Sequence, residues 1–286
     1  MANVNIKEAS KWVDEIHITE CNKTFKYGNH EYCFHLEEPN EKVHYHQLDG
    51  NKFYLKPVMR KSKFIPPHFI LKPVSRWMKH VCYDTAWYNE GASRNHSLWC
   101  TDYRDDDILI LSDIDEIVDS KYADEIISTT RKYGAVTVKI FFTMFYFNLF
   151  CKHCSGPEGY SYRIFAVRGD IMRKTFYNDS DFLRKQGEQS KLLKSVYCLN
   201  GYKGFHHSWL GDENFVANKM LSYAHPMEWH KEQCLDENGL PNISAIKQLI
   251  RDGKSVFGNS TLEIDNSIEL LPEVEQLRRK ESMHFI

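Results

Sequence analysis

The chain of 286 residues lacks several features that would place it in a specialised class. It has no apolar run of about 18 residues, which a membrane-spanning helix requires, and its first residues, MANVNIKEASKWVDE, contain no apolar signal core. Its net charge is only −2, and lysine and arginine are spread along the chain. We therefore expect a soluble, cytoplasmic protein that neither spans a membrane nor binds nucleic acid by neutralising phosphates.

Two further absences concern chemistry. Cys151 and Cys154 form a CxxC pair, but the second pair that a structural zinc site normally needs is missing. The pair also follows an aromatic run, whereas a redox CxxC is expected between a strand and a helix. We expect reduced, non-catalytic thiols, with a disulfide or a partial metal site as the alternatives. No glycine-rich or lysine-rich phosphate loop is present either.

What the chain does have is an ordinary globular composition, with 42% hydrophobic and 27% charged residues. Its length suits one large domain, and no repeat or linker divides it. Alternating or continuous apolar patterns predict strands at 15–20, 108–111, 135–149, 160–167 and 203–211. Helical spacing predicts helices at 5–13, 85–99, 121–133, 215–222 and 243–251. The simplest interpretation is one mixed α/β domain with a C-terminal extension.

The segment DILILSDIDE, residues 107–116, places carboxylates directly after an apolar strand. Asp113 and Asp115 are two residues apart, so we expect both to face one way at the strand end, with Ile114 turned into the core. Crowded carboxylates repel, and a divalent cation such as Mg²⁺ or Mn²⁺ would relieve this. Helix capping is the alternative role for such acids, and Asp119 and Ser120 fit that role better.

A second polar cluster occurs in KGFHHSWLGDEN, which contains His206, His207, Asp212 and Glu213. A histidine pair between aromatic residues is common in protein cores. Beside the carboxylates after the strand, however, His206 would supply the nitrogen ligand that completes a metal site.

These residues belong to four blocks that resemble glycosyltransferase family 17. The blocks occur in the family's order between residues 13 and 258: VDEIHITECNKTFKYG, then SRNHSLWC with DDDILILSDIDEIVD, then KGFHHSWLGDENFVANKMLSYAHPMEW, and finally IKQLIRDGKSVFG. Val118 stands where the family usually has proline. The best-known members transfer N-acetylglucosamine to the core mannose of N-glycans. Without a membrane anchor, this chain resembles a soluble bacterial or viral relative.

The resemblance implies a fold and an activity. The fold is a single α/β domain of the GT-A (Rossmann-like) type with a mixed central sheet over residues 1–260, followed by an extension over 261–286. The family's first strand, which lines the uracil pocket, has no counterpart in this sequence, so by this resemblance the chain is either naturally abbreviated or lacks its start. The activity is an inverting sugar transfer from a nucleotide diphosphate donor, such as a UDP-sugar, to a glycan hydroxyl, with Mn²⁺ or Mg²⁺ as cofactor.

The resemblance also assigns residue roles. The metal ligands would be Asp113, Asp115 and His206. The nucleotide sugar would contact Glu20, Asn22, Arg94, Asn95 and Asp113. The acceptor would contact Glu116, Trp209 and His207, and Glu116 could instead order its loop. The catalytic base would be Glu213, with Asp212 as the alternative. Three aromatic side chains either stack on sugars or pack in the core: Phe205, Trp209 and Trp229.

Two other functions use the same residues. A nucleotidyl or phosphoryl transferase would employ the same acidic motif and metal, although such an enzyme favours the phosphate loop that this chain lacks. A catalytically silent carbohydrate-binding or partner subunit would keep the fold without the chemistry. Binding of UDP with and without Mn²⁺ discriminates between the enzyme and the silent module.

Overall fold

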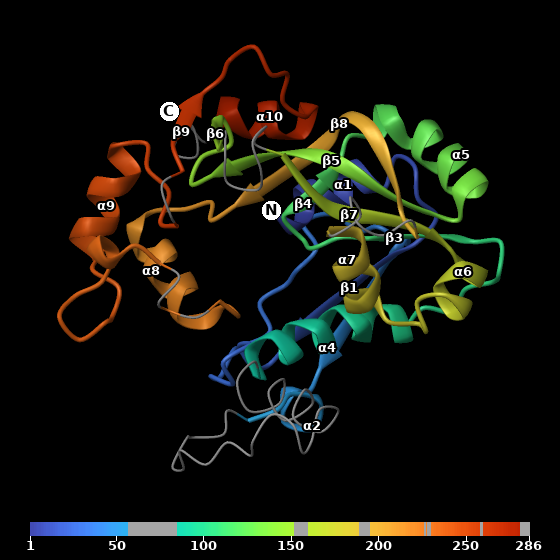
Figure 1. Ribbon diagram of the computed structural model, residues 1–286, viewed down its shortest axis with the longest axis horizontal. Helices are drawn as coiled ribbons and strands as arrows, with labels where there is room; N and C mark the ends of the chain where they lie inside the picture. The colour runs from blue at the N-terminus through green and yellow to red at the C-terminus, as the bar shows by residue number, and fades with distance from the viewer. Residues whose placement is uncertain are drawn as a thin grey trace, which may run out of the picture.

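A computed structural model shows a mixed α/β protein with one seven-stranded sheet and a separate sheet of two strands (Figure 1). The structure describes residues 1–56, 85–151, 160–188, 195–225, 227, 230–257 and 260–280. Cys154 and Trp229, to which the sequence drew attention, lie outside these ranges. Among the described residues, no helix has both the length and the apolar character needed to cross a membrane.

The large sheet is mixed but mostly antiparallel. Its main strands lie in the order β3 (Ile108–Leu111), β7 (Tyr160–Arg168), β5 (Ala135–Met144), β8 (Tyr197–Ser208) and β4 (Glu116–Val118). Two short strands, β6 (Leu149–Cys151) and β9 (Leu262–Ile264), continue the sheet from the end of β5. Only β5 and β8 pair in parallel among these described strands. The predicted mixed α/β class with a mixed sheet is thus confirmed.

Helices cover both faces of this sheet. Successive residues of β5 point to opposite sides and are mostly apolar, so both faces need to be buried. On one face, Val136 and Val138 pack with Ile126 of α5 (Ala123–Tyr133). On the other face, Ala135 belongs to the same buried cluster as Leu98. That cluster also joins three helices, α4 (Thr85–Trp99), α6 (Gly169–Lys174) and α7 (Ser180–Glu188).

The first and the last helix of the described residues pack together beside the sheet. Val4 of α1 (Ala2–Ala9) shares a buried cluster with Leu271 and with Val274 of α10 (Pro272–Lys280). A further cluster packs α8 (Glu213–Ser222) and α9 (Ile243–Arg251) against the end of β5, near the short helix η3 (Glu232–Cys234). Residues 262–280 therefore continue the sheet and core begun by the preceding residues.

The small sheet consists of β1 (Ile16–Cys21) and β2 (Val43–Leu48), which pair in parallel, followed by α2 (Gly50–Phe53). Helix α4 holds this sheet from one side, where the Ser97 hydroxyl donates to Thr19 Oγ1 at 2.7 Å. The predicted strand at 15–20 is thereby confirmed with a shift of one residue.

Several predicted boundaries agree with the structure. The predicted helix 85–99 has the same limits as α4. The predicted helix 121–133 begins as η1 (Ser120–Tyr122), which Asp119 caps by accepting from the Lys121 N–H, and continues as α5 up to Gly134. The predicted helix 5–13 is shifted to Ala2–Ala9.

Two expectations need correction. Residues 108–111 were expected to form a buried strand, but β3 is half-buried because it lies at the edge of the sheet. Cys151 is disulfide-bonded, so the expectation of reduced thiols is wrong for this residue. Among the described residues, the expectation of reduced thiols holds for Cys21, Cys33, Cys100 and Cys234.

Candidate functional site

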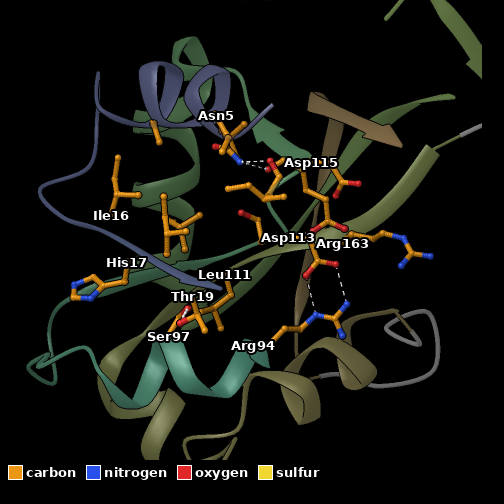
Figure 2. Close-up of a pocket in the computed structure, with 18 of the residues that line it drawn as sticks. Asn5, Ile16, His17, Thr19, Arg94, Ser97, Leu111, Asp113, Asp115 and Arg163 are labelled. Atoms are coloured by element: carbon orange, nitrogen blue, oxygen red, sulfur yellow. Dashed lines mark hydrogen bonds and ion pairs between the residues drawn. The ribbon is translucent and has the colours of Figure 1, made fainter. Parts of the chain in front are cut away.

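A cavity of about 1790 Å³ lies where the two sheets and α4 meet. Residues 16–20 of β1 and 108–111 of β3 both line it, as does the loop that joins β3 to β4. Figure 2 shows Asp113 and Asp115 at one side of this space, with Arg94 and Arg163 beside them and His17 at the opposite side. The acidic residues that follow β3 therefore line this cavity.

The loop from β3 to β4 is a tight turn and does not continue the strand. The Glu116 N–H donates to the Asp113 carbonyl at 3.0 Å, and the Asp113 N–H donates to Glu116 Oε2 at 2.8 Å. Since strand alternation stops here, Ile114 is 45% exposed, and the expectation that it enters the core is wrong. The carboxylates of Asp113 and Asp115 consequently meet different partners.

Asp113 is held by arginines. Arg94 Nε and Nη2 donate to its two carboxylate oxygens, each at 2.8 Å, in the fork geometry that suits a carboxylate (Figure 2). Arg184 Nη2 lies 3.2 Å from Asp113 Oδ2. Burial alone would raise the pKa of Asp113, but the Arg184 and Arg94 guanidinium groups hold it far below its usual value.

Asp115 faces a histidine and a lysine. Its Oδ2 lies 3.6 Å from His206 Nε2 and 3.7 Å from Lys219 Nζ. Burial raises the pKa of Asp115, and the neighbouring His206 and Lys219 more than offset this, so the pKa is strongly lowered. The predicted neighbourhood of Asp115 and His206 is thus present, with Lys219 as an additional cation.

The pairing of β4 with β8 explains how His206 reaches this loop. Glu116 and His206 are opposite each other in the antiparallel register, and the His207 N–H donates to the Asp115 carbonyl at 2.9 Å. A glycine at position 204 is required for this approach, because a Cβ there would lie 2.0 Å from the Ile117 carbonyl oxygen.

His207 points away from the cavity, since neighbouring residues of β8 face opposite sides. Its ring stacks on Phe205 and meets Phe147 edge-on, and the Thr143 hydroxyl lies 2.7 Å from its Nδ1. Burial lowers the pKa of His207 to about 3, so the ring is neutral. The structure therefore places His207 in the core, not where an acceptor sugar would bind.

Glu116 and Arg184 form a buried ion pair beneath the loop. Arg184 Nη2 lies 2.7 Å from Glu116 Oε1, and Nη1 lies 3.2 Å from Oε2. The Glu116 side chain is fully buried and also accepts from the Asp113 N–H. Of its two predicted roles, Glu116 therefore performs the ordering of the loop.

Glu90 is a cavity residue that the sequence did not single out. Its Oε1 lies 3.1 Å from Arg94 Nη2, and its Oε2 is buried without a hydrogen-bond partner. Burial raises the pKa of Glu90 to about 7. Such a carboxylate exchanges protons near neutral pH, which is a common property of functional groups.

The early strand contributes one of its two predicted residues to the cavity. Glu20 lines it and accepts hydrogen bonds from Tyr45 Oη at 2.6 Å and from the Cys33 and Phe34 N–H groups at 3.0 Å. Burial raises the pKa of Glu20, but a hydrogen bond from the Cys33 thiol together with these hydrogen bonds lowers it to about 2. Asn22 instead accepts from the Gly50 N–H at 2.8 Å, which orders the start of α2.

Asn95 has a structural role rather than the predicted contact with a nucleotide. Its side-chain oxygen accepts from the N–H and hydroxyl of Ser180, both at 2.7 Å, and its amide donates to Asp179 at 3.0 Å. Asn95 thus ties α4 to the first turn of α7, the helix that carries Arg184.

The predicted base residues lie outside the cavity. Asp212 caps α8 by accepting from the Phe215 N–H at 2.9 Å, and this hydrogen bond lowers its pKa. Glu213 pairs with Lys247 Nζ at 2.6 Å, and this contact lowers its pKa as well. The acids after the histidine pair therefore begin a helix, which is the ordinary role of such residues.

The aromatic candidates pack mainly in the core. Phe205 is buried with Ile117, and Trp209 meets the rings of Tyr223 and Phe257 edge-on. Trp209 also lines the cavity, and Lys219 Nζ lies 5.2 Å from its ring centre. Of the two described aromatic residues proposed for sugar stacking, Trp209 lines the cavity and Phe205 does not.

The donor set fits a divalent cation only in part. Among the described residues, the groups whose ligand atoms lie within 4.8 Å of one another do not include Asp113, Asp115 and His206 together. Both oxygens of Asp113 already bind Arg94, whereas Asp115 Oδ2 and His206 Nε2 lie close enough to share one cation. Asp115 and His206 therefore fit a metal, and Asp113 does not.

Comparisons of the chain with protein-family models, with curated proteins and with solved structures find no match. The resemblance to glycosyltransferase family 17 therefore remains a prediction. Any function has to be argued from the chemistry of the cavity.

Proposed function

We propose that the protein is an inverting glycosyltransferase of the GT-A type that uses a nucleotide diphosphate sugar. The observation that carries this proposal is the set of cations that line the cavity beside the acidic loop. This set comprises Arg94, Arg163, Arg184 and Lys219. A diphosphate carries several negative charges, and guanidinium groups bind phosphate oxygens in pairs.

The position of these charges supports the nucleotide-sugar assignment. They gather after the end of β3, where ligands of α/β proteins commonly bind. The opposite wall, formed by β1, has no lysine or arginine among its lining residues and includes Ile16 and Ile18, which suits a base and a ribose better than a second phosphate. A donor lying across the cavity would thus contact both sheets.

A divalent cation, Mn²⁺ or Mg²⁺, would be held by Asp115 and His206 in this proposal. When bound, such an ion stabilises the charge that grows on the departing diphosphate. Arg94 and Arg184 supply the same stabilisation from the protein itself, since their cationic groups are fixed by Asp113 and Glu116.

Glu90 is the side chain that we assign as general base, in place of Asp212 and Glu213. It accepts the proton of the acceptor hydroxyl while the hydroxyl oxygen forms the new bond to the sugar and the sugar–phosphate bond breaks, so that the diphosphate leaves. Asp113 and Asp115 are unsuited to this step because their pKa values are too low. Glu90 has the pKa that proton transfer at neutral pH favours.

The test is a panel of nucleotide diphosphate sugars, incubated with the protein and Mn²⁺ and analysed for slow hydrolysis. We expect one donor class to release free sugar and a nucleoside diphosphate, and Asp115→Ala to lose at least tenfold of this rate. Release of a nucleoside monophosphate and a sugar phosphate would indicate a nucleotidyl transferase instead. If no donor is consumed, the transferase proposal is contradicted.

A further inference from the structure

A second group of metal-binding side chains lies on the small sheet. The parallel register places His17 of β1 directly opposite His44 of β2, so both rings lie on one face. His46 follows two residues after His44 and returns to that face, opposite Thr19. Glu15 immediately precedes β1. The sequence hides this group because it depends on how two strands pair.

The ligand atoms of three of these residues converge. One oxygen of Glu15 and one nitrogen each of His17 and His44 lie within 4.8 Å of one another. Glu15 Oε2 is 3.0 Å from His17 Nε2, and the rings of His17 and His44 are stacked with their centres 4.8 Å apart. Glu15 and His44 are exposed, so an ion from solution reaches the group directly.

His46 fixes the orientation of His17. Its Nε2 lies 2.9 Å from His17 Nδ1, and the two rings are nearly parallel. If Nδ1 of His17 carries the proton and donates it to His46, the lone pair of His17 Nε2 points toward Glu15. Metal-binding histidines usually have such a partner on the second ring nitrogen, because it sets the tautomer and the ring angle.

We propose that Glu15, His17 and His44 bind one Zn²⁺ ion, and that His46 is a positioning residue for His17. Two imidazole nitrogens and one carboxylate oxygen form a ligand set typical of Zn²⁺, and a water molecule completes four-coordination. The ion links β1 to β2, since its ligands come from both strands. Glu15 and His17 also line the cavity, so the ion lies at its rim on the side opposite Asp113 (Figure 2).

The other group of suitable ligands is less available. Glu20, His30 and Cys33 also converge within 4.8 Å. The carboxylate of Glu20, however, already accepts hydrogen bonds from Tyr45 and from the Cys33 and Phe34 N–H groups. We therefore place the ion at Glu15, His17 and His44, and the experiment separates the two groups.

The experiment measures Zn²⁺ binding to chelator-treated protein by calorimetry, with Co²⁺ as a spectroscopic substitute for Zn²⁺. We expect one strong site per chain, and the visible absorption of Co²⁺ bound by nitrogen and oxygen ligands. His44→Ala should weaken the affinity at least tenfold while leaving the circular dichroism unchanged, because this side chain is exposed. His46→Ala, which removes no ligand, should weaken it by about 10- to 100-fold.

Three matched variants locate the ion. His35→Ala removes an exposed histidine outside both groups. Cys33→Ala removes one ligand of the group formed by Glu20, His30 and Cys33. Asp115→Asn removes the carboxylate that we propose as a metal ligand after β3. All three should keep the strong site. The proposal is overturned if Zn²⁺ binds His44→Ala as tightly as the wild type, if Cys33→Ala or Asp115→Asn abolishes binding, or if no strong site exists. None of these outcomes depends on transferase activity.

Discussion

At the residue scale, the carboxylates after β3 are distinguished by the cations that they meet. Asp113 is bound by Arg94 through two hydrogen bonds, and Asp115 lies near His206 and Lys219. Glu116 lies beneath both, paired with Arg184. Each of these three acids thus lies beside a basic side chain, and the local negative charge is compensated.

The Glu116–Arg184 pair is where a single substitution should cost most stability. Arg184→Met leaves a fully buried carboxylate without its cation, and we expect a loss of about 3 to 5 kcal/mol in the free energy of unfolding. Arg104→Met is the matched control: Arg104 is 82% exposed beside Asp107, so this substitution should leave the free energy of unfolding nearly unchanged. Urea unfolding measures both, and equal losses would contradict the importance of the buried pair.

The pKa of Glu90 should determine how the reaction rate depends on pH. Since its pKa is about 7 and the base must be ionised, the transfer or hydrolysis rate should fall about tenfold per pH unit below 7 and level off above it. Glu90→Gln should remove most of the rate at every pH. Glu213→Gln, which changes a carboxylate outside the cavity, should leave the profile unaltered.

The same group also makes stability depend on pH. A carboxyl whose pKa is raised on folding stabilises the fold below its ordinary pKa of 4.5, and that contribution is lost as the pH rises through about 7. Glu90→Gln should therefore gain stability relative to the wild type between pH 5 and pH 8, by about 2 to 3 kcal/mol. A difference that does not change with pH would show that Glu90 titrates normally.

At the element scale, α7 depends on α4 for its position. Asn95 of α4 accepts from the N–H and hydroxyl of Ser180 at the start of α7, and α7 in turn carries Arg184 under the acidic loop. The hydrogen bonds between Asn95 and Ser180 thus join α4, which lines the cavity, to α7, which positions Arg184. Asn95, which the resemblance assigns to the nucleotide, makes these hydrogen bonds between the two helices and does not line the cavity.

The expected result of Asn95→Ala is a loss of about 1 to 2 kcal/mol in stability, together with weaker binding of a nucleotide diphosphate, because α7 and Arg184 lose their support. Asn242→Ala removes the cap of α9 and should lose similar stability without affecting the nucleotide. Hydrogen exchange in 180–188 should accelerate only in Asn95→Ala. If both variants bind the nucleotide equally, the connection through α7 is refuted.

The sequence predicts elements well where the signal is local. The limits of α4 and the cap at Asp119 follow from residues within the segment itself. Helix α7, which starts at Ser180, was not predicted, although Asp179 provides a local cap by accepting from the Phe182 N–H at 3.0 Å. The edge position of β3 and the face shared by His17 and His44 depend on strand pairing, which periodicity does not specify.

At the scale of the whole molecule, one cavity is bordered by both sheets, and different kinds of side chain line its two sides. The side of β3 is rich in paired charges, and the side of β1 ends in the histidines of the small sheet. Sequence reasoning located Asp113, Asp115 and His206 near this space, but not Glu90 or Arg184. Those two are brought in by helices, and neither belongs to a motif that marks it in the sequence.

The central claim is that this cavity binds a nucleotide diphosphate, and calorimetry with UDP tests it most directly. With Mn²⁺ present, we predict saturable binding at one site. Removing Mn²⁺, or replacing Asp115 by asparagine, should weaken the affinity at least tenfold, because Asp115 and His206 would hold the ion. Equal binding with and without Mn²⁺ would remove the metal from the account, and no binding of UDP in either condition would contradict the account itself.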